Sequence, residues 1–373
     1  MKIFLCAGEA SGDIHGANLV RALRTLEPGV ECEGLGGPRM QQAGLVLRHD
    51  LASRAIMGYI EVVRSLGFIK RIFDDTLARL REWRPDALVL VDYPGFNLRL
   101  AARAHEMGIP VVYYISPQIW AWKKGRIKTI RRVVNKMMVI LPFEKAIYDT
   151  AGVPCEYVGH PLLDHITQTP VSAAYAGKQV VGILPGSRRM EIERVLPVMI
   201  EVARRLREQY PDARFVSPCV DAEREAQVRA IAGDFPLETK VGGMYDVLRA
   251  ARFALVCSGT ATLETALFQV PMAVLYRAAA LEMWLARRVI GKRLVGMSLV
   301  NILANRRVVP EFLQEEVTAE RILPHALDLM ADSPARREML AELAAIRGLL
   351  KPGASEAAAR VVLEVARGAA HGG

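Results

Sequence analysis

The feature that most constrains the fold is the alternation of short apolar runs with amphipathic stretches along the whole chain. The apolar runs have the length of buried strands, and the stretches between them have the spacing of helices. The runs are Ile3–Ala7, Ala87–Val91, Val111–Ile115, Met137–Leu141, Tyr157–Val158, Val180–Leu184, Arg214–Ser217, Phe253–Cys257 and Met272–Tyr276. The helical stretches include Ala17–Leu26, Ile60–Trp83, Asn97–Met107, Leu196–Tyr210 and Ala222–Ala232. Strands that alternate with helices predict βαβ units and a mostly parallel sheet.

The length of 373 residues favours two domains, because one domain commonly holds about 150 residues. A polar break over residues 160–178, with two prolines, separates the two series of runs and is interpreted as the linker. We therefore predict an α/β protein of two doubly wound Rossmann-like domains that face a cleft. The expected domains are residues 1–167 and 168–353, with an Ala-rich helix over 354–373 packing back on the first. Ligands of such folds bind at the carboxyl ends of the strands.

Composition narrows the class of protein further. Hydrophobic residues make up 51% and charged residues 24% of the chain, which excludes a disordered or fibrous protein. The five cysteines form no Cys-x-x-Cys pair, so we expect buried thiols in a cytosolic protein and no disulfide framework. No histidine pair has the spacing of metal ligands, and no metal site is predicted. No apolar stretch approaches the roughly 18 residues of a membrane span, and the N-terminal run is too short for a signal peptide.

The net charge of +9 predicts an anionic partner. Nucleic acid, an acidic membrane surface and phosphorylated small molecules all fit this charge.

Two loops of the first domain carry carboxylates at strand ends. Residues 8–13, Gly-Glu-Ala-Ser-Gly-Asp, follow the first strand, but the glycines do not match the dinucleotide pattern G-x-G-x-x-G. A plain tight turn explains this spacing equally well, and the pairing of Glu9 with Asp13 favours a site. Asp92 ends another strand just before Pro94 and Gly95. A half-shielded carboxylate there suits a general base, with a turn cap as the alternative.

Two loops of the second domain suit a nucleotide diphosphate. Gly186, Ser187 and Arg188 follow a strand and open a helix, where backbone N–H groups and a guanidinium can hold phosphate oxygens. An ordinary N-cap would explain Ser187 alone. The second loop is Ser258, Gly259 and Thr260, followed by Glu264 about one helical turn later. A ribose diol could hydrogen-bond to this glutamate.

Basic residues gather in two segments, and an apolar segment lies elsewhere. The first basic cluster follows Trp120 and Trp122, and the second lies after residue 286. They comprise Lys123, Lys124, Arg126, Lys128, Arg131 and Arg132, then Arg287, Arg288, Lys292 and Arg293. Solvated helix faces are the ordinary explanation, and an anionic membrane or a nucleic acid is the functional one. Residues 57–69, which begin at Met57, form either a core helix or an exposed lip that enters lipid.

The motifs together resemble the lipid-A-disaccharide synthase family over nearly the whole chain. They are A-G-E-A-S-G-D at 7–13, G-G-P-R-M at 36–40, M-G-Y-I-E-V at 57–62, D-Y-P-G-F-N at 92–97, S-P-Q-I-W-A-W at 116–122, L-P-F-E-K at 141–145, G-H-P at 159–161, L-P-G-S-R at 184–188, S-G-T-A-T-L-E at 258–264, N-I-L-A-N at 301–305 and P-E-F-L-Q at 310–314. The family often has Asp where this chain has Gly95, which leaves Asp92 as the only carboxylate of its loop.

The resemblance implies a GT-B glycosyltransferase that works without a metal or other cofactor. It would condense UDP-2,3-diacylglucosamine with 2,3-diacylglucosamine 1-phosphate, called lipid X, with inversion at the anomeric carbon. UDP and a β-1,6-linked tetraacyl disaccharide 1-phosphate, an intermediate of lipid A biosynthesis, would be the products. Because both substrates carry acyl chains, the enzyme is expected to lie peripherally on the cytoplasmic face of the inner membrane. The basic clusters and the 57–69 lip would make that contact, and nucleic acid is no longer expected as a partner.

The resemblance also assigns roles to residues. Asp92 would deprotonate the 6-hydroxyl of the acceptor, with Glu9 and Asp13 lining the same site and Glu9 the alternative base. Arg188 and Ser187 would hold the diphosphate, and Asn301 would contact the donor near the reacting bond. Further substrate contacts are expected from Gly8, Ser11, Gly12, Met57, Trp120, Trp122, Gly186, Ser258, Gly259, Thr260 and Glu264.

Two other functions remain open on the residues. One is a different GT-B enzyme, such as a UDP-N-acetylglucosamine transferase or 2-epimerase. The other is a nucleotide-dependent module that binds membrane or RNA without catalysis.

Overall fold

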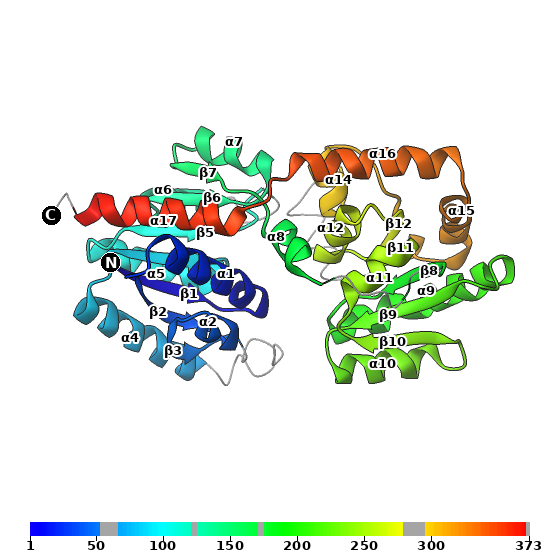
Figure 1. Ribbon diagram of the computed structural model, residues 1–373, viewed down its shortest axis with the longest axis horizontal. Coiled ribbons are helices and arrows are strands. Elements are labelled where there is room, and N and C mark those ends of the chain that lie inside the picture. Colours follow the sequence, from blue (N-terminus) through cyan, green and yellow to red (C-terminus); the bar gives the residue numbers. More distant parts are fainter. Residues whose placement is uncertain (53–65, 121–124, 171–174, 176, 279–294, 371–373) are drawn as a thin grey trace. The chain divides into compact units, whose positions relative to one another are not determined.

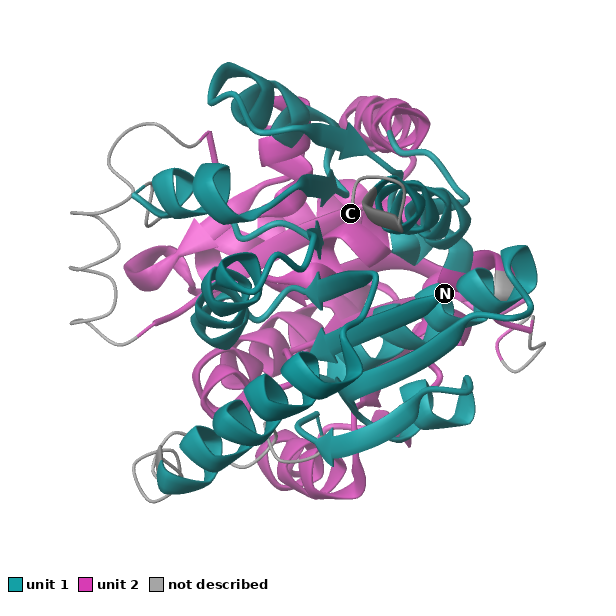
Figure 2. Cartoon of the chain, turned by 90° about the vertical axis from the view of Figure 1, so that its left-hand side faces the viewer, with its two compact units in different colours: residues 1–164, 350–373 teal, residues 165–349 magenta. Residues whose placement is uncertain are grey.

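The computed structural model describes residues 1–52, 66–120, 125–170, 175, 177–278 and 295–370 (Figure 1). The chain forms two compact units, which are coloured separately in Figure 2. Unit 1 comprises residues 1–164 and 350–373, and unit 2 comprises residues 165–349. The two domains expected from the sequence meet at residues 167 and 168, which lie inside helix α8 (Pro161–Gln168).

Unit 1 is built on a parallel sheet in the order β3-β2-β1-β4-β5-β6-β7. The strands in that order are β3 (Val46–Asp50), β2 (Glu31–Gly36), β1 (Lys2–Ala7), β4 (Ala87–Val91), β5 (Val111–Tyr114), β6 (Lys136–Val139) and β7 (Cys155–Tyr157). Chain order reverses between β1 and β4, whose residues Ala7 and Val91 are paired. Ligands of open α/β sheets bind at such a switch point.

Helices cover both faces of this sheet. The helices of unit 1 are α1 (Ala10–Leu26), α2 (Pro38–Gln42), α4 (Leu66–Trp83), α5 (Pro94–Glu106), α6 (Arg126–Val133), α7 (Pro142–Thr150), the first half of α8, and α17 (Ala354–Ala370). Strand β4 shows why the sheet has two cores, since Leu88 and Leu90 enter one hydrophobic cluster and Val89 and Val91 enter the other. The period of two in a strand places alternate side chains on opposite faces.

The C-terminal helix α17 completes unit 1. Val362, Leu363 and Ala366 are buried in the same cluster as α1 and β1, and α17 runs beside α1 in Figure 1. Complete burial of one Val or Leu side chain contributes about 1.5–3 kcal/mol. The start of α17 is also tied to α8, because the Asp164 carboxylate accepts hydrogen bonds from the backbone N–H groups of Gly353 and Ser355 at 2.6 and 3.2 Å.

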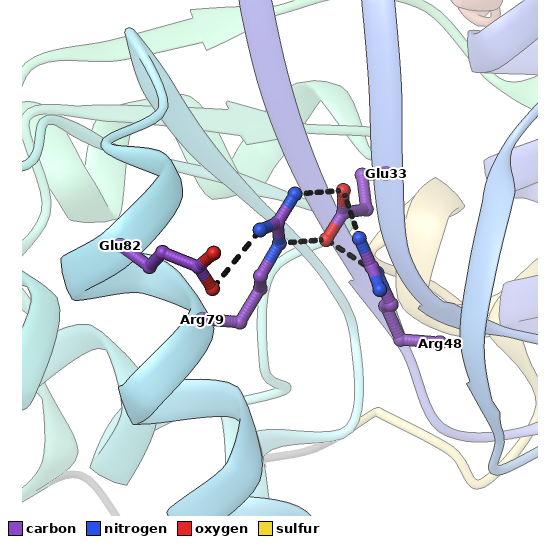
Figure 3. Close-up of polar contacts among 4 residues, drawn as sticks. All are labelled: Glu33, Arg48, Arg79 and Glu82. Atoms are coloured by element: carbon purple, nitrogen blue, oxygen red, sulfur yellow. Dashed lines mark hydrogen bonds and ion pairs between the residues drawn. The ribbon is translucent and has the colours of Figure 1, made fainter.

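A cluster of charges joins α4 to the outer strands of unit 1 (Figure 3). Glu33 of β2 is 4% exposed and accepts paired hydrogen bonds from Arg48 of β3 and from Arg79 of α4, at 2.6–2.9 Å. Arg79 also pairs with Glu82 at 3.1 Å. Burial raises the pKa of Glu33, but the two guanidinium groups outweigh burial and hold it below its ordinary value. The ionised carboxylate thus fastens α4 to the sheet edge.

Unit 2 has a second parallel sheet, in the order β10-β9-β8-β11-β12-β13. The strands are β10 (Leu237–Val241), β9 (Arg214–Cys219), β8 (Val180–Leu184), β11 (Ala251–Cys257), β12 (Met272–Tyr276) and β13 (Glu311–Leu313). The helices are α9 (Arg189–Gln209), α10 (Ala222–Ala232), α11 (Met244–Ala250), α12 (Thr260–Leu267), α14 (Leu299–Ala304), α15 (Ala319–Met330) and α16 (Pro334–Leu349), with the short 3₁₀ turn η2 (Gln314–Glu316). Here the order reverses between β8 and β11.

The structure corrects several sequence expectations. Residues 161–168 of the supposed linker form helix α8. Helix α1 begins at Ala10, seven residues before the helical stretch expected over Ala17–Leu26. The strands β2, β3, β10 and β13 were not expected from the sequence, because their glycines and charged residues conceal the apolar pattern.

Candidate active site

The switch point of unit 1 brings two predicted loops together. Residues 8–13 follow β1 and residues 92–97 follow β4, and these strands are neighbours in the sheet. Glu9 is the N-cap residue of α1 and is exposed. Gly8 is buried under the ring of Tyr93. Ser11 is exposed and Gly12 buried in the first turn of α1.

Asp92 has an unusual backbone and a shifted acidity. Its φ is +45°, and that of Tyr93 is +48°, a left-handed conformation that non-glycine residues adopt at a cost. Burial and the nearby charge of Glu9 raise the pKa of Asp92 to about 6, against smaller opposing effects from the Tyr93 backbone N–H and from Arg126. A carboxylate with this pKa is mostly ionised at pH 7 and binds a proton far more readily than an ordinary aspartate.

Asp13 lies in the first turn of α1. Its carboxylate is 4% exposed and accepts hydrogen bonds from the backbone N–H groups of Gly37, Arg39 and Met40 at 2.9–3.1 Å. Both oxygens are therefore used to hold the start of α2 against α1. Three backbone donors thus give Asp13 a structural role, and the expectation that it lines the site stays a prediction.

A buried acid that the sequence did not reveal lies at the ends of β5 and β6. Glu144 of α7 is 2% exposed, and its Oε1 accepts hydrogen bonds from Ser116 Oγ at 2.8 Å and Trp120 Nε1 at 3.0 Å. Its Oε2 accepts one from the backbone N–H of Leu141 at 3.2 Å. Burial raises the pKa of Glu144 to about 7, although these hydrogen bonds oppose the rise. The motifs at 116–122 and 141–145 thus meet at one carboxylate, which fixes the half-buried indole of Trp120.

The first basic cluster is described in part. Helix α6 buries Ile130 and Val133 and exposes the side chains of Lys128, Arg131 and Arg132. Arg126, at the start of α6, is close enough to lower the pKa of Asp92. The other residues expected at the substrate or the membrane lie outside the described residues. These are Met57, Trp122, Lys123, Lys124, Arg287, Arg288, Lys292 and Arg293.

The first loop at the unit 2 switch point has an exposed arginine above a glycine turn. Gly186 has φ +104°, and a β-carbon on it would lie 2.6 Å from Glu191 Oε2. Ser187 is exposed, and Arg188 is the N-cap residue of α9 with an 83% exposed side chain. Arg188 Nη1 lies 3.0 Å from Glu191 Oε1. Among the described residues, Glu191 is the ion-pair partner of this guanidinium, which can exchange the carboxylate for a phosphate.

The second loop of unit 2 follows β11. Ser258 Oγ donates to the Met297 carbonyl at 3.3 Å, and Gly259 and Thr260 are exposed at the start of α12. Glu264 is partly buried and accepts a hydrogen bond from the Tyr245 hydroxyl at 3.1 Å. Burial raises the pKa of Glu264, and the Tyr245 hydrogen bond only partly opposes this.

Asn301 lies at the start of α14. It is completely buried, and its Nδ2 donates to the Val309 carbonyl and to Glu311 Oε1 at 2.9 and 2.7 Å. Its Oδ1 accepts from the N–H groups of Val308 and Val309. The polar groups of this amide bond within unit 2, and the expected contact of Asn301 with the donor stays a prediction. Asn301 joins the motifs at 301–305 and 310–314 to each other.

Comparisons with known proteins agree with the fold and the motifs. A UDP-GlcNAc 2-epimerase from Neisseria meningitidis superposes with a TM-score of 0.65 over 98% of this chain and 99% of its own, at 13% identity. The glycosyltransferase of kitacinnamycin superposes with a TM-score of 0.60 over 98% of both chains, at 14% identity. Two parallel-sheet α/β units of this kind define the GT-B class, so the predicted fold class is confirmed.

The family model for lipid-A-disaccharide synthetase matches residues 3–365. The lipid-A-disaccharide synthases of Geobacter sulfurreducens and Myxococcus xanthus are each 40% identical over 98% of this chain and 97% of their own length. The chain belongs to the lipid-A-disaccharide synthase family, and the predicted resemblance is confirmed. It is accordingly a glycosyltransferase of lipid A biosynthesis. Among the described helices, none combines the length and apolar character needed to cross a membrane.

Proposed function

We propose that this protein transfers a 2,3-diacylglucosaminyl group from UDP to the 6-hydroxyl of 2,3-diacylglucosamine 1-phosphate. The bond between the anomeric carbon and the UDP oxygen breaks, and its electron pair leaves with UDP. The acceptor oxygen forms the new β-1,6 bond from the opposite face, so the configuration inverts. The acceptor proton passes to a base on the enzyme.

The observation that carries the proposal is the partly buried carboxylate of Asp92 at the switch point of unit 1. The raised pKa of about 6 leaves it ionised near neutrality, while burial keeps it basic enough to take a proton from a hydroxyl. The nearby charge of Glu9 strengthens this property. We therefore assign the acceptor to unit 1 and the role of general base to Asp92.

We assign the donor to unit 2. Arg188, with Gly186 and Ser187, would bind the diphosphate and stabilise the charge that develops on UDP. Ser258, Gly259 and Thr260 would supply further hydrogen bonds to phosphate oxygens. The ribose would hydrogen-bond to Glu264, whose carboxylate the Tyr245 hydroxyl already orients.

We further propose that the enzyme works peripherally on the cytoplasmic face of the inner membrane, where acylated substrates would lie. The outer face of α6 supports this docking, because its exposed Lys128, Arg131 and Arg132 form no ion pair with a described residue. Basic side chains near an anionic surface attract it by about 1 kcal/mol each. Liposome sedimentation of a variant with all three changed to Ser should show weaker binding at low salt, and unchanged binding would exclude this face.

The reaction itself is tested by turnover of UDP-2,3-diacylglucosamine with radiolabelled lipid X, with and without EDTA. The expected product is the tetraacyl disaccharide 1-phosphate at the same rate in both, and Asp92→Asn should lower kcat by about a thousandfold. Wild-type turnover by this variant would remove Asp92 as the base. Turnover of UDP-N-acetylglucosamine in place of the acylated donor would instead favour another GT-B activity.

A further inference from the structure

The backbone carbonyl of Asp92 is held by two side chains from neighbouring elements. Tyr113 Oη of β5 donates to it at 2.6 Å, and Asn97 Nδ2 of α5 donates to it at 2.7 Å. On its other side, the N–H of Asp92 donates to the Tyr114 carbonyl at 3.0 Å. Both polar groups of this peptide position are thus fixed by the sheet and by α5.

These bonds stabilise a backbone conformation that the chain would otherwise avoid. Asp92 and Tyr93 are consecutive residues with φ near +45°, and such a pair persists only when its surroundings determine it. Side chains of a regular strand alternate between its two faces, so the left-handed backbone of Asp92 sets a side-chain direction different from the one that a continued β4 would give. The two donors therefore act on the orientation of the carboxylate through the backbone.

The buried amide of Asn97 lowers the stability of the fold while it makes this contact. Its side chain is completely buried, and Nδ2 also approaches the carbonyls of Val91 and Cys6 at 3.2 and 3.4 Å. Its Oδ1, in contrast, is buried with no hydrogen-bond partner among the described residues. An unsatisfied buried acceptor lowers stability, so the amide is explained by what its nitrogen holds.

We propose that Tyr113 and Asn97 are positioning residues, which lock the Asp92 backbone in its left-handed turn and so aim the carboxylate at the acceptor hydroxyl. This inference rests on the proposed function of Asp92 as the base. It does not require either side chain to touch a substrate.

The chain offers a matched pair of variants for the test. Tyr113 and Tyr114 are adjacent, completely buried tyrosines of β5, and they enter the hydrophobic clusters on opposite faces of the sheet. Tyr113→Phe removes a hydroxyl that holds Asp92, and Tyr114→Phe removes a hydroxyl that does not. We expect kcat to fall about tenfold in the first variant, which corresponds to the loss of one hydrogen bond. In the second variant, kcat should stay within about twofold of wild type. KM for either substrate should change by less than about twofold in both.

A second readout separates positioning from a general structural effect. The charges that act on Asp92 come from Glu9 before α1 and Arg126 of α6, and Tyr113 faces it from β5. When the turn loosens and water reaches the carboxylate, its pKa should fall, and the acidic limb of the pH profile of kcat/KM should move to lower pH. Asn97→Leu keeps the side-chain size and should give the same movement with an unfolding temperature close to that of wild type.

The outcomes distinguish the two proposals. In the Asp92→Asn background, the Tyr113→Phe change should alter the residual rate less than about twofold, because it acts through the missing carboxylate. Wild-type activity of Asp92→Asn itself would overturn the assignment of the base. A full loss in Asp92→Asn, combined with a Tyr113→Phe variant that matches Tyr114→Phe in kcat and in its acidic limb, would overturn the positioning role. An undiminished tenfold effect in the double variant would also overturn it.

Discussion

The ring of Tyr93 occupies the space that a β-carbon at position 8 would need. A β-carbon built on Gly8 lies 2.2 Å from Tyr93 Cδ1, far closer than such atoms approach in proteins. The requirement for glycine here concerns space, since Gly8 is not among the residues with positive φ. The loops after β1 and β4 are therefore packed tightly against each other at Gly8 and Tyr93. Glu9 directly follows Gly8 in the sequence, and Asp92 directly precedes Tyr93.

Replacing Gly8 with alanine should displace Tyr93 and the strained turn that includes Asp92. We expect kcat to fall by about ten- to hundredfold, because small displacements of reacting groups cost that much, while the unfolding temperature changes little. Gly95→Ala is the matched control, since a β-carbon there meets nothing within 4 Å and alanine favours the helix. Equal kcat in the two variants would show that the fit at Gly8 does not govern the base.

The acidic limb of the pH profile should report Asp92. Because the base works only when ionised, kcat/KM should fall below a pH of about 6, tenfold for each further unit. The charge of Glu9 raises this pKa and that of Arg126 lowers it. Glu9→Gln should therefore move the limb to lower pH and Arg126→Gln should move it to higher pH. If the acidic limbs of the two variants moved in the same direction, this electrostatic account would be contradicted.

Glu144 should make the stability of unit 1 depend on pH. The pKa of this buried acid is raised from 4.5 to about 7, so the folded state binds the proton more tightly than the unfolded state. The resulting stabilisation is complete below the ordinary pKa of glutamate and is lost as the pH rises through about 7, at most about 3 kcal/mol. Glu144→Gln removes this dependence. Chemical unfolding of both proteins at pH 5 and pH 8 measures their free energies of unfolding. The free energy of unfolding of the variant should rise relative to that of wild type at pH 8, and the same difference at both pH values would exclude a buried ionising acid.

Two adjacent arginines of unit 2 allow a test of the donor site. Arg188 and Arg189 are 83% and 72% exposed, and each pairs with one glutamate of α9. Arg188→Ala should weaken UDP binding by about ten- to hundredfold, since a hydrogen bond to a charged group contributes about 1.5–3 kcal/mol. Arg189→Ala removes a similar charge and should leave the affinity within about threefold of wild type. Calorimetric titration with UDP measures both, and equal losses would indicate only a general effect of charge.

The features that sequence reasoning found share a simple physical origin. Asp92, Gly186 and Arg188 stand directly after apolar strands, where both the strand and the end of the strand are visible in the pattern of residues. The hydrogen bonds of Asp13 and Asn301 could not be seen in this way. Their polar atoms are taken by backbone groups that are distant in the sequence, such as those of Gly37 and Val309, and only the folded chain brings these donors and acceptors together.

Other residues escaped notice because they lie within runs that the sequence explains as core. Tyr113 is one of five consecutive apolar residues, and its hydroxyl looks incidental until the carbonyl of Asp92 is seen beside it. Glu144 follows a proline at the start of a helix, a position typical of an exposed capping glutamate. Its carboxylate accepts a hydrogen bond from Trp120, which belongs to another loop, and the sequence alone does not reveal this contact.

The return of the chain to unit 1 in helix α17 has a consequence for synthesis. Ribosomes deliver the polypeptide from its amino end, so residues 165–349 emerge complete before residues 350–373 exist. Unit 2 can therefore finish folding before unit 1. Until α17 is made, the side of α1 that α17 covers stays exposed. A ribosome-bound chain from which residues 1–349 but not 350–370 have emerged should contain a unit 2 that resists proteolysis and a unit 1 that is susceptible to it. Emergence of the α17 residues is therefore the step that completes the unit carrying the candidate base.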